Sequence, residues 1–140
     1  MVYTFDNYNY VIRLDKGEKL VESLDTFVLE THLQGAWING IGGVLQVELG
    51  FYDLDAKAYQ WRTFDNAYEI TNLHGSLAMG EDGKPAFHLH GTFCDAQFQA
   101  IGGHVKEAVV AGTCELFVHR SYKPLHRRLD AGVGLNTLAI

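Results

Sequence analysis

The sequence predicts an α+β domain, in which a largely antiparallel β-sheet packs against one main amphipathic helix. One stretch has apolar residues at helical spacing, most of the remaining chain is rich in β-branched and aromatic residues, and clusters of turn-forming residues separate these stretches. The chain has 140 residues, the usual size of one domain, and no segment has the composition of a linker. We therefore expect residues 1–140 to form a single domain.

The predicted helix covers residues 17–33. Its apolar residues recur three or four positions apart and form one stripe, made of Leu20, Leu24, Phe27 and Val28. Asp15 and Glu18 have the spacing of a capping box, and Gly35 lies where a glycine commonly follows the end of a helix. One apolar face of this helix is thus available to cover the sheet.

The predicted strands are joined by short connections. They cover residues 8–14, 36–51, 59–64, 68–79, 87–94 and 108–120. Glycines at positions 40, 42 and 43 interrupt the second of these strands and indicate a β-bulge. A strong turn signal at residues 80–85 makes the flanking strands antiparallel neighbours.

Charge and composition limit the function classes. Eleven basic and 17 acidic residues give a net charge of −6, which disfavours a protein that binds nucleic acid over its whole surface. Two cysteines, Cys94 and Cys114, allow at most one disulfide, far from the density of a secreted scaffold. The first residues have no signal-peptide pattern, and no window approaches the ~20 apolar residues of a membrane helix. We expect a soluble, cytoplasmic protein without a membrane partner.

A His-x-His motif carries the chemistry of the sequence. Side chains alternate across a strand, so His88 and His90 share one face with Thr92 and Cys94. Neutral imidazole binds zinc and similar metals through a ring nitrogen. Two ligands do not make a tight site, and the alternative interpretation is a polar strand face or a pair of hydrogen-bonded histidines.

A third ligand is available ten residues beyond Cys94. His104 follows two glycines and is expected to reach the other two histidines through a glycine-containing loop. Three histidines with an open fourth position suit a catalytic metal, or a metal that recruits an outside ligand. His74 is a further candidate as a ligand or as a partner that orients one. Cys94 is interpreted as a reduced, half-buried thiol, with a fourth ligand as the alternative.

Two smaller signals have alternative interpretations. Glu69 and Asp95 are candidate general bases near a metal, although a surface carboxylate is the simpler interpretation. Residues 119–128 form the only basic cluster, which is interpreted as a solvated edge or a subunit contact, with a phosphate or acidic partner as the alternative.

The segments His88-Leu89-His90-Gly91-Thr92-Phe93 and Ile101-Gly102-Gly103-His104-Val105 occur after Ala36 to Val44 and Tyr68 to Gly75. In this order, over roughly residues 5–125, they resemble the PPC domain, the plants-and-prokaryotes-conserved domain, which was long a domain of unknown function. The resemblance is to the stand-alone prokaryotic type without an AT-hook.

The resemblance implies an α+β fold assembled as a homotrimer. Some prokaryotic members resemble metal proteins, with one metal per subunit held by histidines that match His88, His90 and His104. Zinc is the first expectation, although imidazole also suits nickel, copper and iron. Plant members carry an AT-hook with Arg-Gly-Arg, a motif that this sequence lacks, so direct DNA binding is not expected.

Two functional classes follow. The first is a regulatory or interaction module, DNA-associated through partners, whose metal is structural or senses a ligand. The second is a small metal-dependent enzyme that acts on a soluble metabolite through an open coordination position. No catalytic residue and no cofactor besides the metal are assigned from the sequence.

Overall fold

The structure is a computed structural model that describes residues 1–140. It contains one helix and nine strands. In chain order these are β1 (Val2–Phe5), β2 (Asn9–Asp15), α1 (Leu20–Thr31), β3 (Ala36–Asp53), β4 (Ala58–Phe64), β5 (Tyr68–Met79), β6 (Pro85–Cys94), β7 (Ala100–Arg120), β8 (Arg127–Asp130) and β9 (Leu135–Leu138). The predicted combination of a mostly antiparallel sheet with one helix is confirmed.

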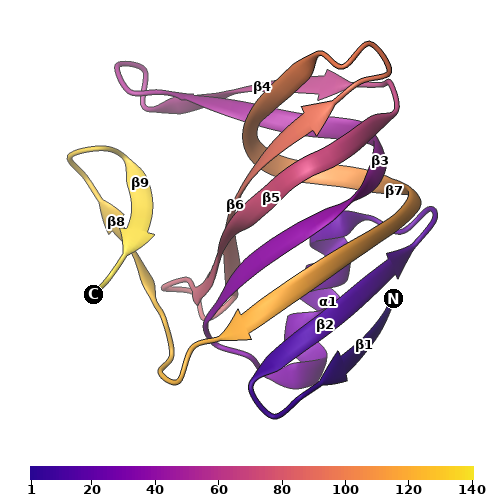
Figure 1. Cartoon of the computed structure of the whole chain (residues 1–140). Helices are drawn as coiled ribbons and strands as arrows, with labels where there is room; N and C mark the ends of the chain where they lie inside the picture. Colours follow the sequence, from indigo (N-terminus) through magenta and orange to yellow (C-terminus); the bar gives the residue numbers. More distant parts are fainter.

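Seven strands form one sheet in the order β1-β2-β7-β6-β5-β3-β4, and every neighbouring pair is antiparallel. The sheet curls so far that β7 also pairs with β3, which closes a ring of β3, β5, β6 and β7 (Figure 1). The last two strands, β8 and β9, form a separate hairpin beside this sheet.

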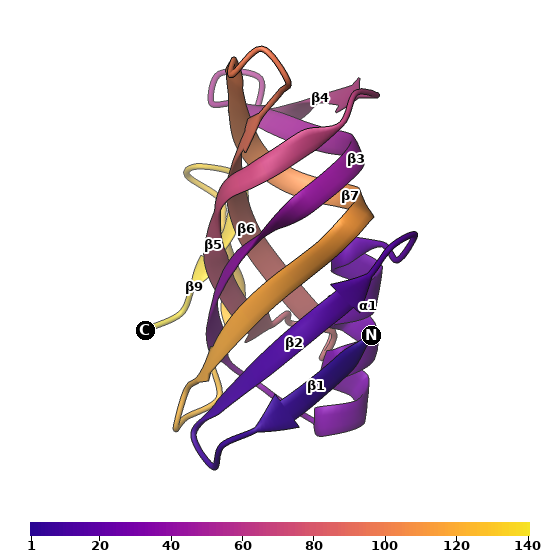
Figure 2. The same ribbon diagram turned by 45° about the vertical axis from the view of Figure 1, so that its right-hand side comes forward.

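The helix covers part of the sheet with its apolar stripe. Its residues Leu20, Leu24, Phe27 and Val28 are buried, as predicted, and belong to one core of 24 residues. Figure 2 places α1 behind β1 and β2, and the ring of Phe27 makes T-shaped contacts with the rings of Tyr3 and Tyr10 from these two strands. The helix therefore covers the part of the sheet that β1 and β2 form.

The helix begins at Leu20, three residues later than expected. Gly17 has a φ of 89°, which no α-helix contains, and the chain turns there between β2 and the helix. Glu18 accepts the predicted hydrogen bond from the Asp15 amide at 2.7 Å, but this contact closes the turn before the helix. The first free amides of the helix donate to the Glu107 carboxylate of β7 instead, Val21 at 2.8 Å.

The end of the helix also differs from the expectation. Thr31 is the last helical residue, and His32 takes the left-handed conformation of a C-cap with a φ of 54°. Gly35 was the expected cap and lies beyond it, packed against Leu125. A histidine thus replaces glycine at a position that favours glycine.

Most predicted strand ranges agree with the structure, and the largest error concerns β7. This strand begins at Ala100 rather than near residue 108, so Gly102 to His104 lie within a strand and not in a loop. The strand β1 and the hairpin β8–β9 were not predicted. The bulge in β3 is confirmed between Gly40 and Gly42, where Gly42 has a φ of 152°. The structure contains no helical segment with the length and apolar character of a membrane span.

Candidate metal centre

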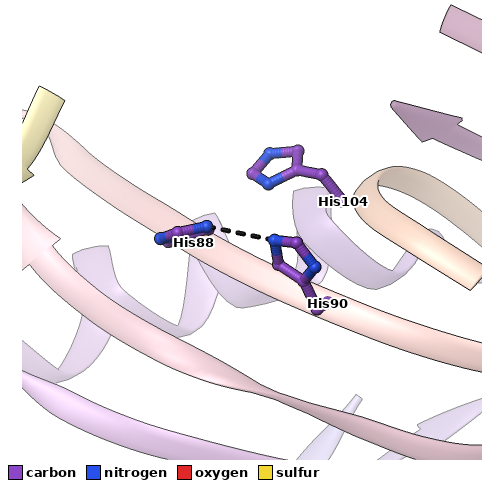
Figure 3. A group of neighbouring side chains, drawn as sticks. All are labelled: His88, His90 and His104. Carbon is purple, nitrogen blue, oxygen red and sulfur yellow. Dashed lines mark hydrogen bonds between the residues drawn. The ribbon is translucent and has the colours of Figure 1, made fainter. Parts of the chain in front are cut away.

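Three histidines meet on the outer face of β6 and β7. His90 of β6 lies directly opposite His104 of β7 in the strand register, and His88 follows two residues away on the same face of β6. The alternation of β6 is as predicted, since Leu89 and Phe93 are buried on the core side. Figure 3 shows that the three rings face a common point. The register of two strands, rather than a flexible loop, brings His104 to the other two.

The close packing of β5 against β6 helps to set this arrangement. Gly75 of β5 pairs with Leu89, and a Cβ atom at Gly75 would collide with the backbone carbonyl of His88. Only glycine allows this approach of the two strands without a shift of the strand that carries both histidines.

The spacing of the rings fits one small metal ion. The Nε2 atoms of His88 and His90 lie 3.1 Å apart, and one ring nitrogen from each of the three histidines lies within 4.8 Å of the others. Two nitrogens bound to tetrahedral zinc at about 2.0–2.1 Å are separated by about 3.3 Å. The His88–His90 pair therefore already has the separation of two zinc ligands.

The electrostatics of the group favour neutral rings. Burial is the main cause that lowers the pKa of all three histidines, and the charge of Arg127 lowers the pKa of His88 further. The pKa of His104 falls to about 4. Neutral imidazole is the form that binds a metal. The Nδ1 atom of His104 is buried without a hydrogen-bond partner, which a bound metal at this group would explain. These residues fit a metal.

A cavity of about 640 Å³ lies next to the histidines. All three line it, together with Trp37 and residues of the C-terminal hairpin. No aspartate or glutamate lines the cavity, although the chain has 17 acidic residues. The cavity is large enough for a small organic molecule beside the histidines.

The hairpin β8–β9 forms one wall of this cavity. At its base, Arg127 donates hydrogen bonds to Ser76 Oγ of β5 at 2.8 Å and to the backbone oxygen of Asn136 at 2.9 Å. At its tip, the Tyr52 hydroxyl donates to the Val133 carbonyl and Lys57 Nζ donates to the Ala131 carbonyl. The hairpin is therefore attached to the sheet at both ends.

Tyr59 of β4 lies on the histidine side of the cavity. Its ring centroid is 4.9 Å from that of His104 and 4.7 Å from that of Trp61. Burial raises the pKa of the Tyr59 hydroxyl, with a smaller contribution from Tyr52. The hydroxyl therefore keeps its proton at neutral pH.

The other predicted candidates do not join the histidine group. His74 lines the cavity, bonds to Asn72 and stacks near Trp37, but it is not among the three histidines that converge. Cys94 is a free, half-buried thiol outside the group, and neither Glu69 nor Asp95 lines the cavity. The Asp95 carboxylate accepts backbone amides of its own turn.

Arg127 and Tyr59 are polar residues of the cavity that the sequence did not indicate. Arg127 belongs to the basic cluster that was interpreted as a solvated edge, yet only 6% of it is exposed. Tyr59 was one aromatic residue among many in a predicted strand. Neither position carries a local signal, because both reach the cavity through pairings between distant segments.

The fold and this site together define a class: a small α+β domain with a curled antiparallel sheet, one packed helix and a three-histidine group beside a cavity. The sequence model of the family described as the Plants and Prokaryotes Conserved (PCC) domain matches residues 3–121. The chain belongs to this family, and the resemblance found in the sequence is confirmed. The hairpin β8–β9 lies beyond the matched residues.

Several solved structures share the fold. A putative DNA-binding protein from Ralstonia eutropha is 33% identical with a TM-score of 0.92, and the match covers 99% of this chain and 95% of that one. A putative DNA-binding protein from Bacteroides thetaiotaomicron is 28% identical with a TM-score of 0.93, over 99% and 96% of the two chains. A metal-containing protein from Archaeoglobus fulgidus is 30% identical with a TM-score of 0.88, over 100% and 99%. No curated protein matches the chain.

Proposed function

We propose that the protein binds one divalent transition metal per subunit through His88, His90 and His104, with zinc as the first choice, and that it binds a small molecule beside this metal. The observation that carries the proposal is the convergence of three neutral histidines at the wall of a cavity. The similar protein from Archaeoglobus fulgidus contains a metal, which supports the first part.

The donor set determines what such a metal offers. Three imidazoles would hold the metal and leave room for a further ligand, and zinc bound there would act as a Lewis acid toward an oxygen or nitrogen atom of that ligand. The chain's own residues orient that ligand. Tyr59 and Arg127 offer hydrogen-bond donors at the cavity, while Trp37, Leu135 and Leu138 offer apolar surface.

We propose a regulatory or interaction module as the biological role. Two similar proteins are described as putative DNA-binding proteins, but the net charge of −6 and the absence of Arg-Gly-Arg argue for partners that mediate any contact with DNA. The homotrimer and the cytoplasmic location implied above are part of this proposal and stay predictions.

A metal-dependent enzyme is the second candidate. The position of Tyr59 favours it, since this hydroxyl lines the same cavity as the histidines. The enzyme would act on a small soluble metabolite, and Tyr59 would donate a hydrogen bond to it. Turnover of such a metabolite, lost in Tyr59→Phe with the metal retained, would support this candidate over the module.

Metal content tests the common part of both candidates. Untagged purified protein is analysed by elemental mass spectrometry, beside a variant in which His88, His90 and His104 are all alanine. We expect one equivalent of metal per chain, lost in the triple variant. His74→Ala is the matched control, since His74 lines the same cavity outside the group, and it should keep its metal. Retention of full metal by the triple variant would contradict the proposal.

A further inference from the structure

Arg127 is a buried cation in the wall of the cavity. It is 94% shielded from solvent by the protein, with 6% of its surface exposed, and it lines the cavity beside the three histidines. Arginine is rarely buried to this extent without a carboxylate partner, because removing its charge from water is costly. None of the four ion pairs of the structure includes Arg127.

The guanidinium has donors to spare. Of its five N–H groups, one on Nη1 donates to the Asn136 carbonyl and one on Nη2 donates to Ser76 Oγ. The Nε–H group is buried and has no partner. Both partners of Arg127 are neutral oxygens, so its positive charge is not balanced within the chain.

The composition of the cavity indicates the charge of the missing partner. No carboxylate lines it, and Arg127 is its one arginine or lysine. A divalent metal at the histidines would add more positive charge to the same space. A negatively charged ligand would offset part of both charges.

The shape and polarity of the walls indicate the rest of the ligand. Trp37, Ala86, Leu135 and Leu138 supply apolar surface around the charged groups. A volume of about 640 Å³ admits a small organic body in addition to the charged group. These features favour an organic acid over an inorganic anion.

We propose that Arg127 binds the carboxylate of a small organic acid in this cavity, with the ligand lying between the guanidinium and the metal. This inference rests on the proposed function, and it names the ligand class of the same site. Arg127 lies outside the residues that the family model matches, so the C-terminal hairpin supplies this ligand contact to the histidine site.

The test uses isobutyrate as the probe and isobutyramide as its neutral counterpart of equal shape. Binding to the full chain is measured by isothermal titration calorimetry, once with zinc-loaded and once with metal-free protein. We expect isobutyrate to bind the zinc-loaded protein and isobutyramide to bind at least about tenfold more weakly, since a charge-assisted hydrogen bond is lost. Arg127→Gln should lower the affinity for isobutyrate by the same factor.

Arg128→Gln is the matched control. Arg128 is the next residue of β8 and is exposed, so its loss removes the same charge from the protein without touching the cavity. The affinity of this variant for isobutyrate should equal that of the unaltered protein. An equal loss of isobutyrate affinity in Arg127→Gln and Arg128→Gln would show that only the net charge of the protein matters, and this would overturn the proposal.

A second measurement does not depend on the folding of a variant. In NMR spectra of the unaltered protein, the Nε–H resonance of Arg127 is assigned by its through-bond correlations to the side-chain carbons and the backbone of the same residue. We expect this resonance to shift on addition of isobutyrate and to stay in place with isobutyramide. No shift at saturating isobutyrate would overturn the proposal even if Arg127→Gln failed to fold.

The outcomes separate this inference from the metal site. Zinc binding with isobutyrate affinity unchanged in Arg127→Gln would overturn the role of Arg127 and leave the metal site standing. Isobutyrate binding that depends on Arg127 in a protein that takes up no zinc would support the carboxylate contact and contradict the metal. Tighter binding of inorganic phosphate than of isobutyrate would overturn the assigned ligand class.

Discussion

The helix α1 and the hairpin β8–β9 each cover part of the same curled sheet, but they do so in different ways. The helix inserts Leu20, Leu24, Phe27 and Val28 into the core on the inner side. The hairpin covers the histidine side, where hydrogen bonds attach its base and its tip and a cavity lies between. The helix is thus a part of the core, while the hairpin is a wall of the site.

This difference separates stability from function. Burial of apolar side chains supplies most of the favourable free energy of folding, and these buried side chains lie on the side of the sheet that α1 covers. The hairpin buries a charged residue and leaves most of its surface exposed. Changes on the helix side should therefore act on folding, and changes on the hairpin side should act on the site.

The largest effect is expected in the core. Phe27 is 1% exposed, and Phe27→Ala should lower the free energy of unfolding by about 3–5 kcal/mol, measured by urea denaturation. Leu29 is on the same helix but 68% exposed, so Leu29→Ala should change the free energy of unfolding by about 0.5 kcal/mol or less. Equal effects at the two positions would contradict the packing of the helix.

The histidine side should give the opposite result. His104→Ala removes one of three ligands and should weaken zinc binding at least about a hundredfold, measured by competition with a chelator. The free energy of unfolding of the metal-free protein should change by about 1 kcal/mol or less, because His104 packs on the outer face. A loss as large as that of Phe27→Ala would make His104 a core residue.

The lowered pKa of His104 predicts a pH dependence of stability for the metal-free protein. The ring stays neutral in the folded protein down to a pH of about 4, whereas in the unfolded chain it takes up a proton near its ordinary pKa of 6.5. Stability should fall as the pH drops from 6.5 to 4, because protons bind the unfolded chain first. The midpoint of urea denaturation, measured as a function of pH, tests this. In His104→Asn, whose side chain does not titrate, the midpoint should fall less steeply as the pH is lowered.

The smallest effect is expected at the tip of the hairpin. Tyr52→Phe removes the hydrogen bond to the Val133 carbonyl, which is exposed and contributes about 0.5–1 kcal/mol at most. We expect faster hydrogen exchange in β8 and β9 and an unchanged global unfolding. Tyr122 is 88% exposed, and Tyr122→Phe should leave both unchanged. Faster exchange across the whole sheet would contradict a locally attached hairpin.

Periodicity was enough to predict the inner side of the molecule. The stripe of α1 and the alternation of β6 both follow from regular spacing, and burial confirms both. The ends of the helix were less predictable. They are determined by the left-handed backbone conformations of Gly17 and His32, which the apolar spacing does not indicate.

The outer side depended on pairings that the sequence does not contain in one place. The sequence predicts a loop between Cys94 and His104, because the glycines and polar residues of this interval lack the pattern of a strand. In the structure, the interval contains the first part of β7. Its pairing with β6 places His104 opposite His90. The sequence indicates that Arg127 is a surface residue. In the structure it is buried, because the hairpin packs against β5 and Arg127 donates a hydrogen bond to Ser76.

X-ray absorption spectroscopy of the zinc-loaded protein identifies the atoms bound to the metal and so tests the three-histidine centre. We expect three imidazole ligands at about 2.0–2.1 Å and at least one further light-atom ligand, whose signal changes when isobutyrate is added. The scattering of His104→Ala should lose one imidazole. A sulfur ligand at about 2.3 Å, which would implicate Cys94, or four imidazoles with no exchangeable position, would contradict a three-histidine centre open to the cavity.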